Sequence, residues 1–210
     1  MWHKVNPIAF RIPYIKTWKS VWYEDKKTYK DSLALDIKAR ALLEKELTGI
    51  PIGDILCFKD QDVLKVVVYT SKASLILGKT GENKEQIETK LLRKLGLKTE
   101  LEVREIKQPD LNAKIVWFMI ANQIEKRMPY KRAIKQAIAK AMEKWAKWIK
   151  IKVGGRLNGA EIARKETFRE GSVSTQTIRS DIDYATIRAQ TIYGTLGLKV
   201  WIYHWDIFKK

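Results

Sequence analysis

The sequence predicts an α+β chain in two parts: a small α/β sandwich, then a second α/β domain in which two helices cover a small mixed sheet. In the first half, patterns follow the order helix, strand, strand, Gly-x-x-Gly loop, helix, strand. In the second half, two consecutive helical patterns precede short strand-like runs joined by Gly-rich connections. Pro109 lies between the two patterns and marks the expected boundary.

The first helix and a hairpin open the sandwich. Apolar residues recur at helical spacing over residues 28–47, before Gly49 and Pro51, so a helix is expected there. The runs 52–58 and 63–69 are rich in β-branched and aromatic residues and flank a short polar turn. Together they predict two strands joined as a hairpin.

A Gly-x-x-Gly loop follows the hairpin, formed by Gly78, Lys79, Thr80 and Gly81. A helix is expected after it, with Gly96 as its left-handed cap, and then a third strand over residues 98–106. The Gly-Lys-Thr triplet resembles the end of a nucleotide-binding P-loop. That motif needs a glycine five residues before Gly78, where this chain has Ala73, which argues against an NTPase.

The same four residues fit a loop of the KH type. Two glycines there let the backbone approach a sugar-phosphate chain, and the N-terminus of the following helix attracts its anions. The context favours this interpretation because the loop follows two strands, opens a helix and leads to a third strand. On the four residues alone, a plain tight turn is the alternative.

Two helices open the second half, over residues 111–128 and from Pro129 to about residue 149. At 100° per residue, the second helix has an apolar side that includes Trp145 and Trp148. Its opposite arc carries cations: Lys131, Arg132, Lys135, Lys140, Lys144 and Lys147. One side is therefore expected to pack and the other to face solvent or a polyanion. Strands are expected at 149–153 and 200–203.

The charge favours a polyanionic partner. The 41 Lys and Arg exceed the 24 Asp and Glu, a formal net charge of +17. Most of the excess lies in the second half, and residues 111–160 hold 12 cations against two acids. The longest apolar run, 115–121, is too short to span a bilayer. Binding at a membrane surface is an alternative, but the apolar side of the basic helix can pack on the preceding helix without lipid.

Few residues suit catalysis or metal binding. His3, His204 and the single Cys57 have no zinc-ligand spacing, so we expect no metal, no cofactor and no disulfide. The lone cysteine and the absence of a signal-peptide pattern indicate a reduced, cytosolic compartment. Acids between Glu161 and Asp183 alternate with cations, which ion pairing explains most simply. The alternative is a free-standing KH-type RNA-processing or nucleic-acid-cleaving enzyme that uses those acids.

Several motifs carry a family likeness along nearly the whole chain. The N-terminal motifs are Lys4–Arg11, Trp18–Ser20, Asp36–Arg40 and Ile76–Glu82. The C-terminal motifs are Gly155–Arg164, Arg169–Gly171, Arg179–Tyr184, Tyr193–Gly194 and Gly197–Ile202. With them the sequence resembles the small-subunit ribosomal protein number three family, bacterial type.

The resemblance implies an N-terminal arm (1–16), a KH domain of the prokaryotic type II topology (17–107) and a C-terminal ribosomal α/β domain (108–208). It implies a structural, non-enzymatic protein of the small-subunit head, beside the channel where mRNA enters. The implied partners are small-subunit rRNA, mRNA and the small-subunit proteins numbered ten and fourteen, with no membrane. The implied location is a cytoplasmic small subunit, with an organelle matrix ribosome left open.

The expected RNA contacts fall in three groups. The KH loop is expected to bind RNA through Gly78, Lys79, Thr80 and Gly81. In the family, cations on the basic helix face incoming mRNA and help to unwind it, and the matching residues are Lys131, Arg132 and Lys135. The charge and the motifs together predict rRNA contacts at Lys4, Arg11, Lys19, Arg156, Arg164, Arg169 and Arg179.

Overall fold

A computed structural model of the chain describes residues 4–60, 63–78, 81–172 and 175–208. The chain divides into two compact units. The central unit is Trp18–Lys107, and the terminal unit combines Met1–Thr17 with Gln108–Lys210. The N-terminal arm therefore belongs to the same compact unit as the second half of the chain.

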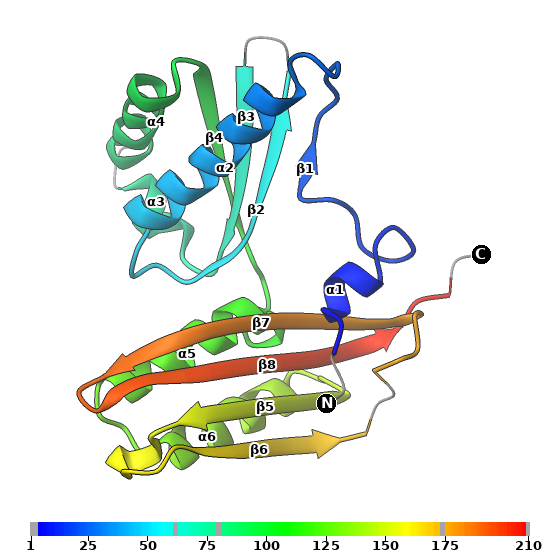
Figure 1. Ribbon diagram of the computed structural model, residues 1–210, viewed down its shortest axis with the longest axis vertical. Coiled ribbons are helices and arrows are strands. Elements are labelled where there is room, and N and C mark those ends of the chain that lie inside the picture. The colour runs from blue at the N-terminus through cyan, green and yellow to red at the C-terminus, as the bar shows by residue number, and fades with distance from the viewer. Residues whose placement is uncertain (1–3, 61–62, 79–80, 173–174, 209–210) are drawn as a thin grey trace. The chain divides into compact units, whose positions relative to one another are not determined.

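The central unit is an α/β sandwich. Its elements are β1 (Ser20–Val21), α2 (Tyr29–Glu46), β2 (Ile52–Lys59), β3 (Val63–Thr70), α3 (Ala73–Leu77), α4 (Glu82–Leu95) and β4 (Lys98–Glu105). Their sheet has the order β1-β2-β3-β4 (Figure 1). The hairpin of β2 and β3 is antiparallel, whereas β4 runs parallel to β3. The structure confirms the expected sandwich and adds the short β1 and α3, which the sequence did not predict.

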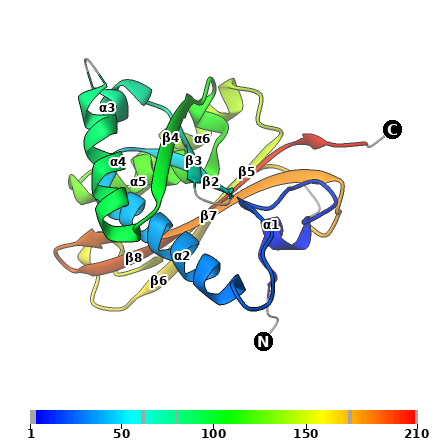
Figure 2. The ribbon, with the colours of Figure 1, turned by 90° about the horizontal axis from the view of Figure 1, so that it is seen from above.

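One face of this sheet forms the core of the central unit. Leu43 of α2 and Leu91 of α4 are almost fully buried against strand residues such as Val66 and Leu101. Figure 2 shows α2 and α4 side by side within this unit. Because both helices bury their apolar sides on the same sheet face, the N-terminus of α4 lies at a defined place on the sandwich.

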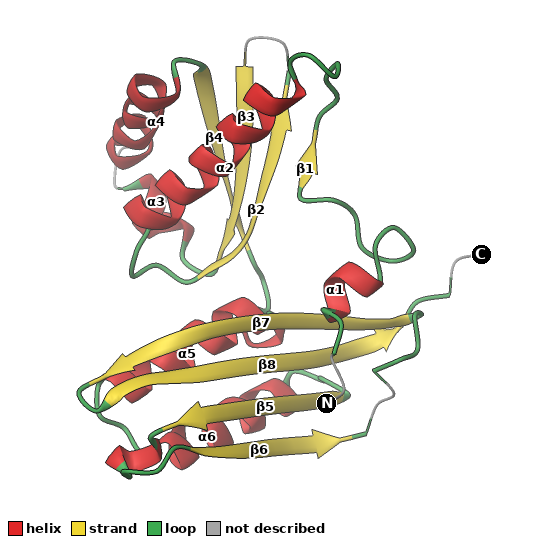
Figure 3. Cartoon of the chain, viewed as in Figure 1, coloured by secondary structure: helices red, strands yellow, loops and turns green. Residues whose placement is uncertain are grey.

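The terminal unit is built on a second sheet. Its elements are α1 (Pro7–Phe10), the 3₁₀ turn η1 (Pro109–Leu111), α5 (Ala113–Glu125), α6 (Tyr130–Glu143), β5 (Trp148–Gly155), the 3₁₀ turn η2 (Leu157–Gly159), β6 (Arg164–Gly171), β7 (Ser180–Thr191) and β8 (Gly194–Asp206). The sheet order is β6-β5-β8-β7, with α5 and α6 behind it (Figure 3). Two helices on one small sheet, as expected, form this domain. No helix among the described residues is long and apolar enough to cross a membrane.

The prediction of a mixed sheet is wrong in the direction of its strands, because all three strand pairs of this sheet are antiparallel. Neighbouring parallel strands need a crossover connection of a dozen or more residues, usually through a helix. No α-helix follows β5 in the described chain, and β7 and β8 are joined by the two residues Ile192 and Tyr193. Antiparallel pairing is what such short connections allow.

The second helix of this unit is shorter than predicted. α6 ends at Glu143, and Trp145 stands just beyond it in a left-handed conformation (φ 69°) with 89% of its surface exposed. Trp148 is buried, but in β5 rather than on the helix. The apolar residues from Trp148 onward alternate as in a strand. Because Trp145 and Trp148 also fit helical spacing, the predicted helix was about six residues too long.

Candidate nucleic-acid interface

The Gly-x-x-Gly loop has the backbone that its glycines allow. Gly78 ends α3 with φ 76°, and Gly81 precedes α4 with φ 90°, both in the region that L side chains rarely adopt. A Cβ at Gly78 would lie 3.1 Å from the Asn83 side chain, so Gly78 is packed closely against the start of α4, whereas Gly81 has open space around it. Lys79 and Thr80, the other two predicted residues of the loop, lie outside the described residues.

The helix after this loop begins with acids. Glu82 and Glu85 lie in the first turn of α4, where they favour the positive end of the helix dipole. They stabilise the helix, but they also offset the attraction of its N-terminus for phosphate. The electrostatic field at this loop is therefore weaker than the glycine pattern alone predicts.

Helix α6 places its cations opposite its core. Ala133 and Ile134 are fully buried in the core of the terminal unit, whereas Lys131, Arg132 and Lys135 are exposed. This agrees with the helical projection, which separated these two sets. Glu143, the last residue of α6, is the single acid in the helix.

The cations at the start of α6 are unfavourable for the helix itself. Lys131 and Arg132 lie in its first turn, which holds no acid, so they face the positive end of the helix dipole. Such a placement destabilises a helix by roughly 0.3–1 kcal/mol per charge at an exposed site. A bound phosphate would relieve this repulsion, so the arrangement suits an anionic ligand better than it suits helix stability.

A hydrogen bond ties the start of α6 to the sheet. The buried Tyr130 hydroxyl donates to Glu166 Oε1 of β6 at 3.1 Å, and Lys131 Nζ lies 5.9 Å from the centre of the Tyr130 ring. Burial raises the pKa of Tyr130, the bond to Glu166 adds to this, and nearby Arg164 opposes it. Arg164 thus lies at the α6 side of the sheet and adds to its positive charge.

Two further cations lie in the turn that leads into α6. Lys126 and Arg127 are exposed, and Arg127 adopts a left-handed conformation (φ 64°) while its backbone N–H donates to Ile124 O. They belong to the 12 cations of residues 111–160 but not to the expected RNA contacts. The short turn between α5 and α6 brings them near the start of α6, and the helical projection of the second helix does not include them.

Arg11 is a correction to the expected rRNA contacts. Its side chain is fully buried, and it donates to four backbone carbonyls, those of Pro7, Thr175, Thr177 and Ser180, at 2.6–3.0 Å. Burial lowers its pKa, which Asp181 partly offsets. No surface of this guanidinium faces solvent, so Arg11 fastens the arm to the start of β7 instead of contacting a phosphate.

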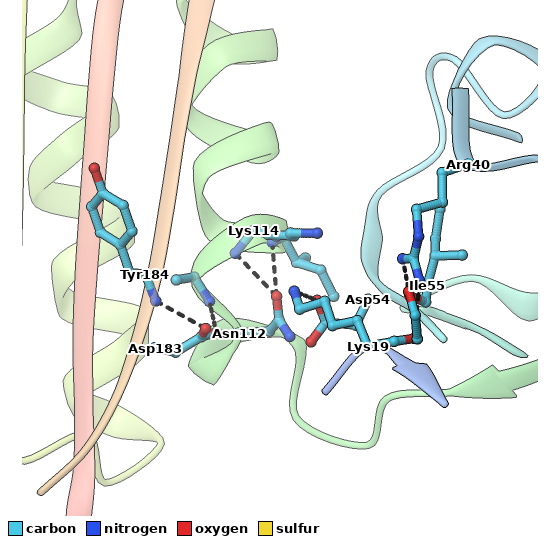
Figure 4. A network of polar contacts seen from close by, with 11 residues as sticks. Lys19, Arg40, Asp54, Ile55, Asn112, Lys114, Asp183 and Tyr184 are labelled. Carbon is cyan, nitrogen blue, oxygen red and sulfur yellow. Dashed lines mark hydrogen bonds and ion pairs between the residues drawn. The ribbon is translucent and has the colours of Figure 1, made fainter. Parts of the chain in front are cut away.

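Lys19 is held within the central unit. Its Nζ lies 2.5 Å from Asp54 Oδ1, as Figure 4 shows. Beside it, Arg40 donates to the carbonyls of Ile55 and Lys19, so it joins α2, β1 and β2. Lys19 therefore already has an anionic partner.

The remaining predicted rRNA contacts are spread over the terminal unit. Arg156 is exposed, and its Nε donates to Ala160 O at 2.9 Å, which orders the turn after β5. Arg179 lies 3.4 Å from Asp206 and over the Phe208 ring. Lys4 and Arg169 are exposed. Lys4 and Arg169 both lie near Lys150, whereas Arg164 and Arg169 point to opposite faces of β6.

The acids between Glu161 and Asp183 have structural partners where their contacts are described. Asp181 pairs with Lys16 at 2.6 Å. Asp183 accepts from the Ala113 backbone N–H at 2.8 Å, and Asn112 accepts from Lys114, so both cap α5 (Figure 4). These contacts place the carboxylates at a helix end and an arm, not around a shared reaction centre.

Metal and thiol chemistry find no support in the described part of the chain. No three His, Cys, Asp or Glu side chains gather there as ligands of a metal ion would. Burial raises the pKa of the Cys57 thiol to about 12, so the thiolate that reacts or binds metal is disfavoured. Cys57 belongs to the core of the central unit.

Both units match known protein families. The KH domain model matches residues 38–111, and the model described as ribosomal protein S3, C-terminal domain, matches residues 120–202. The first match covers the sandwich from the second half of α2 onward, with its Gly-x-x-Gly loop. The second covers the C-terminal part of α5, all of α6 and most of the antiparallel sheet.

Whole-chain relatives agree with these matches. The small ribosomal subunit protein uS3 of Marinobacter nauticus is 42% identical over 207 residues, which cover 99% of this chain and 91% of that protein. The uS3 protein of Hydrogenovibrio crunogenus is 42% identical over 210 residues, 100% of this chain and 92% of that protein. The one of Acinetobacter baylyi is 42% identical over 99% of this chain and 83% of its own length. With its KH sandwich, its C-terminal domain and this identity over its full length, the chain belongs to the small ribosomal subunit protein uS3 family.

Proposed function

We propose that this structural protein of the small ribosomal subunit binds rRNA through the terminal unit and contacts mRNA through Lys131, Arg132 and Lys135. The observation that carries the mRNA contact is the basic first half of α6, where exposed cations face the positive end of their own helix without an acid nearby in sequence. Lys126, Arg127 and Arg164 extend the same positive surface.

The exposure of five cations supports the proposed rRNA contacts. Lys4, Arg156, Arg164, Arg169 and Arg179 all lie at the surface of the terminal unit, where they can meet phosphate oxygens. Such contacts increase affinity and its salt dependence but carry no sequence information. Arg11 leaves this set because it is buried, and Lys19 contributes less because Asp54 already neutralises it.

Two partner assignments complete the proposal. The Gly-x-x-Gly loop of the central unit is proposed as an RNA contact, weakened by the acids that open α4. The small-subunit proteins numbered ten and fourteen are proposed as protein neighbours, and the cytoplasmic small subunit as the location. An assembled subunit is where all of these contacts can be made together.

The test changes Lys131, Arg132 and Lys135 to Ala in the cell's own copy of the protein. Translation of a message with a stable hairpin ahead of the ribosome is expected to fall several-fold relative to an unstructured message. The matched control exchanges the same cations, Lys131→Arg, Arg132→Lys and Lys135→Arg, and keeps the charge. It is expected to retain most of the activity.

Sedimentation of the lysate separates assembly from the mRNA contact. Both variants are expected to migrate with the small subunit at moderate salt and to loosen only as salt rises. Equal translation of both messages by the Ala variant would disprove the mRNA contact. A wild-type chain that sediments among free proteins would disprove the ribosomal location.

A further inference from the structure

The sheet face of the terminal unit that points away from α5 and α6 carries charge of one sign beyond its buried end, which Trp148, Ile182 and Tyr203 form. Ile149, Ile151 and Val153 of β5 point into the core with α5 and α6, so Lys150 and Lys152 point to the other side. The same alternation on the other strands completes a set that we call the basic face: Lys150, Lys152, Lys165, Arg169, Arg188 and Lys199.

The register arranges these cations in rows across the four strands. From β6 to β7, the first row is Arg169, Lys150, Trp201 and Tyr184. The second is Thr167, Lys152, Lys199 and Thr186, and the third is Lys165, Gly154, Gly197 and Arg188. Each row therefore holds two cations and no acid, on strands that lie about 4.8 Å apart.

Beside these three rows, the acids of β6 and Asp183 of β7 point the other way. On β6, Glu166 and Glu170 share the side of Phe168, which packs against the helix-side core. On β7, Asp183 accepts a hydrogen bond from the start of α5, on that same side. Strand alternation thus separates the charges, and the cations of the basic face have no carboxylate among them.

The cations of this face repel one another. Lys150 is partly buried, and burial lowers its pKa; nearby Lys4, Lys152 and Arg169 lower it further. The other five members of the basic face are exposed to solvent. Unlike the paired lysines of the central unit, they are positioned to meet an external anion.

The remaining residues of the face suit a nucleic-acid strand. Lys150 Nζ lies 5.4 Å from the centre of the Trp201 ring, and Trp201 and Tyr184 form a tilted ring pair at 5.2 Å. Gly154 and Gly197 are paired in the third row, between Lys165 and Arg188. The Lys165 side chain lies over Gly154, where a Cβ would be 3.3 Å from Lys165 Cγ, whereas a Cβ at Gly197 would have only the Gly154 carbonyl oxygen within 4 Å. Gly197 therefore permits close approach of another backbone.

We propose that the basic face binds the sugar-phosphate backbone of an RNA single strand across its rows of cations. This rests on the proposed RNA-binding function and assigns it to a second surface, separate from the basic side of α6. RNA is favoured over an acidic protein segment because the cations repeat from row to row with threonine, glycine and aromatic rings between them. A repeating polyanion matches such a grid, and base rings can stack at the aromatic end.

The test compares two triple variants of the full chain with the same change in net charge. Lys152→Gln, Lys165→Gln and Lys199→Gln remove exposed members of the basic face. Lys30→Gln, Lys38→Gln and Lys94→Gln remove exposed lysines of the central unit as the control. The probe is a fluorescent 12-nucleotide oligouridylate, with its Kd measured by anisotropy from 50 to 200 mM KCl.

The basic-face variant is expected to bind the probe about tenfold more weakly. Its slope of log K against log salt is expected to be shallower by about 2, because each phosphate contact to a single strand contributes about 0.7. The control variant is expected to stay close to wild type. An unchanged slope in the basic-face variant, or a loss as large in the control, would overturn the proposal.

Lysine acetylation with and without the probe gives a second measurement. The probe is expected to protect Lys152, Lys165 and Lys199, but not Lys30, Lys38 and Lys94. A poly-glutamate peptide that gives the same protection at the same concentration would overturn the assignment to RNA. A basic-face variant that binds the probe normally, while the Ala variant of α6 fails on structured messages, would reject this inference and leave the proposed function intact.

Discussion

The two units of this protein differ in their net charge and in how their charged side chains are paired. The central unit has 18 Lys and Arg against 15 Asp and Glu, whereas the terminal unit has 23 against nine. In the central unit, cations are paired across elements, as in Lys59 with Glu24 and Lys90 with Glu46. In the terminal unit, exposed cations gather on α6 and on the open sheet face. The excess charge therefore lies on the two surfaces that we propose to bind RNA.

The difference shows how a strongly basic protein folds before a polyanion neutralises its charge. Charges of the central unit largely cancel within the unit, so they serve its own fold. In the terminal unit, an apolar core of two helices and a sheet holds together cations that repel each other. Hydrophobic burial offsets that repulsion until a polyanion neutralises it.

Arg11 is the exception in the terminal unit, and its removal is expected to have the largest effect on stability. Arg11→Met leaves the carbonyls of Pro7, Thr175, Thr177 and Ser180 without their buried donor. Because bonds to charged groups contribute about 1.5–3 kcal/mol each and are not additive, we expect a loss of roughly 3 kcal/mol. Hydrogen exchange is expected to accelerate in β7 and to stay unchanged in β3.

Lys4→Met is the control for Arg11, because it removes an exposed cation of the same arm. It is expected to leave exchange unchanged and to weaken RNA binding slightly. If Arg11→Met instead weakened RNA binding at unchanged stability, Arg11 would be a surface contact, as the sequence first predicted.

Two glycines test how tightly each unit is packed. Gly171 of β6 has φ 80°, and a Cβ there would collide with the carbonyl of Lys147, the residue before β5. Gly49 of the central unit has φ 94° with open space around it. We expect Gly171→Ala to lower the free energy of unfolding by about 2–3 kcal/mol and Gly49→Ala by about 1 kcal/mol. Thermal unfolding of the two variants measures this, and equal losses would contradict the expected collision.

Sequence patterns predicted the central unit well because the apolar residues of each longer element follow a single periodicity, either helical or strand-like. Its helix from Tyr29, its hairpin and the Gly96 cap all agree with the expected positions within a residue or two. Short α3 and β1 were missed because five and two residues show no periodicity. Their places depend on tertiary contacts, such as those of Arg40 with the carbonyls of Lys19 and Ile55.

The terminal sheet was harder to predict because β6 lacks the apolar alternation that β5 shows. In β6, only Phe168 is a large apolar residue, so no strand was predicted there. The exposed cations of α6 were predicted correctly from helical spacing alone. The basic face was not, because it depends on which strands pair and in which register. The burial of Arg11 depends in the same way on carbonyls about 165 residues away.

The smallest expected effect that distinguishes the two units is the pH dependence of their stability. His204 of β8 is in the terminal unit, and the central unit contains no histidine. Burial lowers the pKa of His204 below its usual 6.5; Asp181 and Asp183 oppose this, and Lys16 adds to it. The unfolded chain therefore binds this proton more tightly, so the stabilisation is full above pH 6.5 and is lost as the pH falls toward the folded pKa.

His204→Gln is accordingly expected to reduce the drop in the unfolding midpoint of the terminal unit between pH 7.5 and 5.5. Hydrogen exchange at β8, corrected for its intrinsic pH dependence, localises the effect, with β3 of the central unit as the internal control. The expected change is smaller than those at Arg11 and Gly171 because the acids nearby offset part of the burial. An identical drop in both proteins would mean that the pH dependence arises from the carboxylates and not from this histidine.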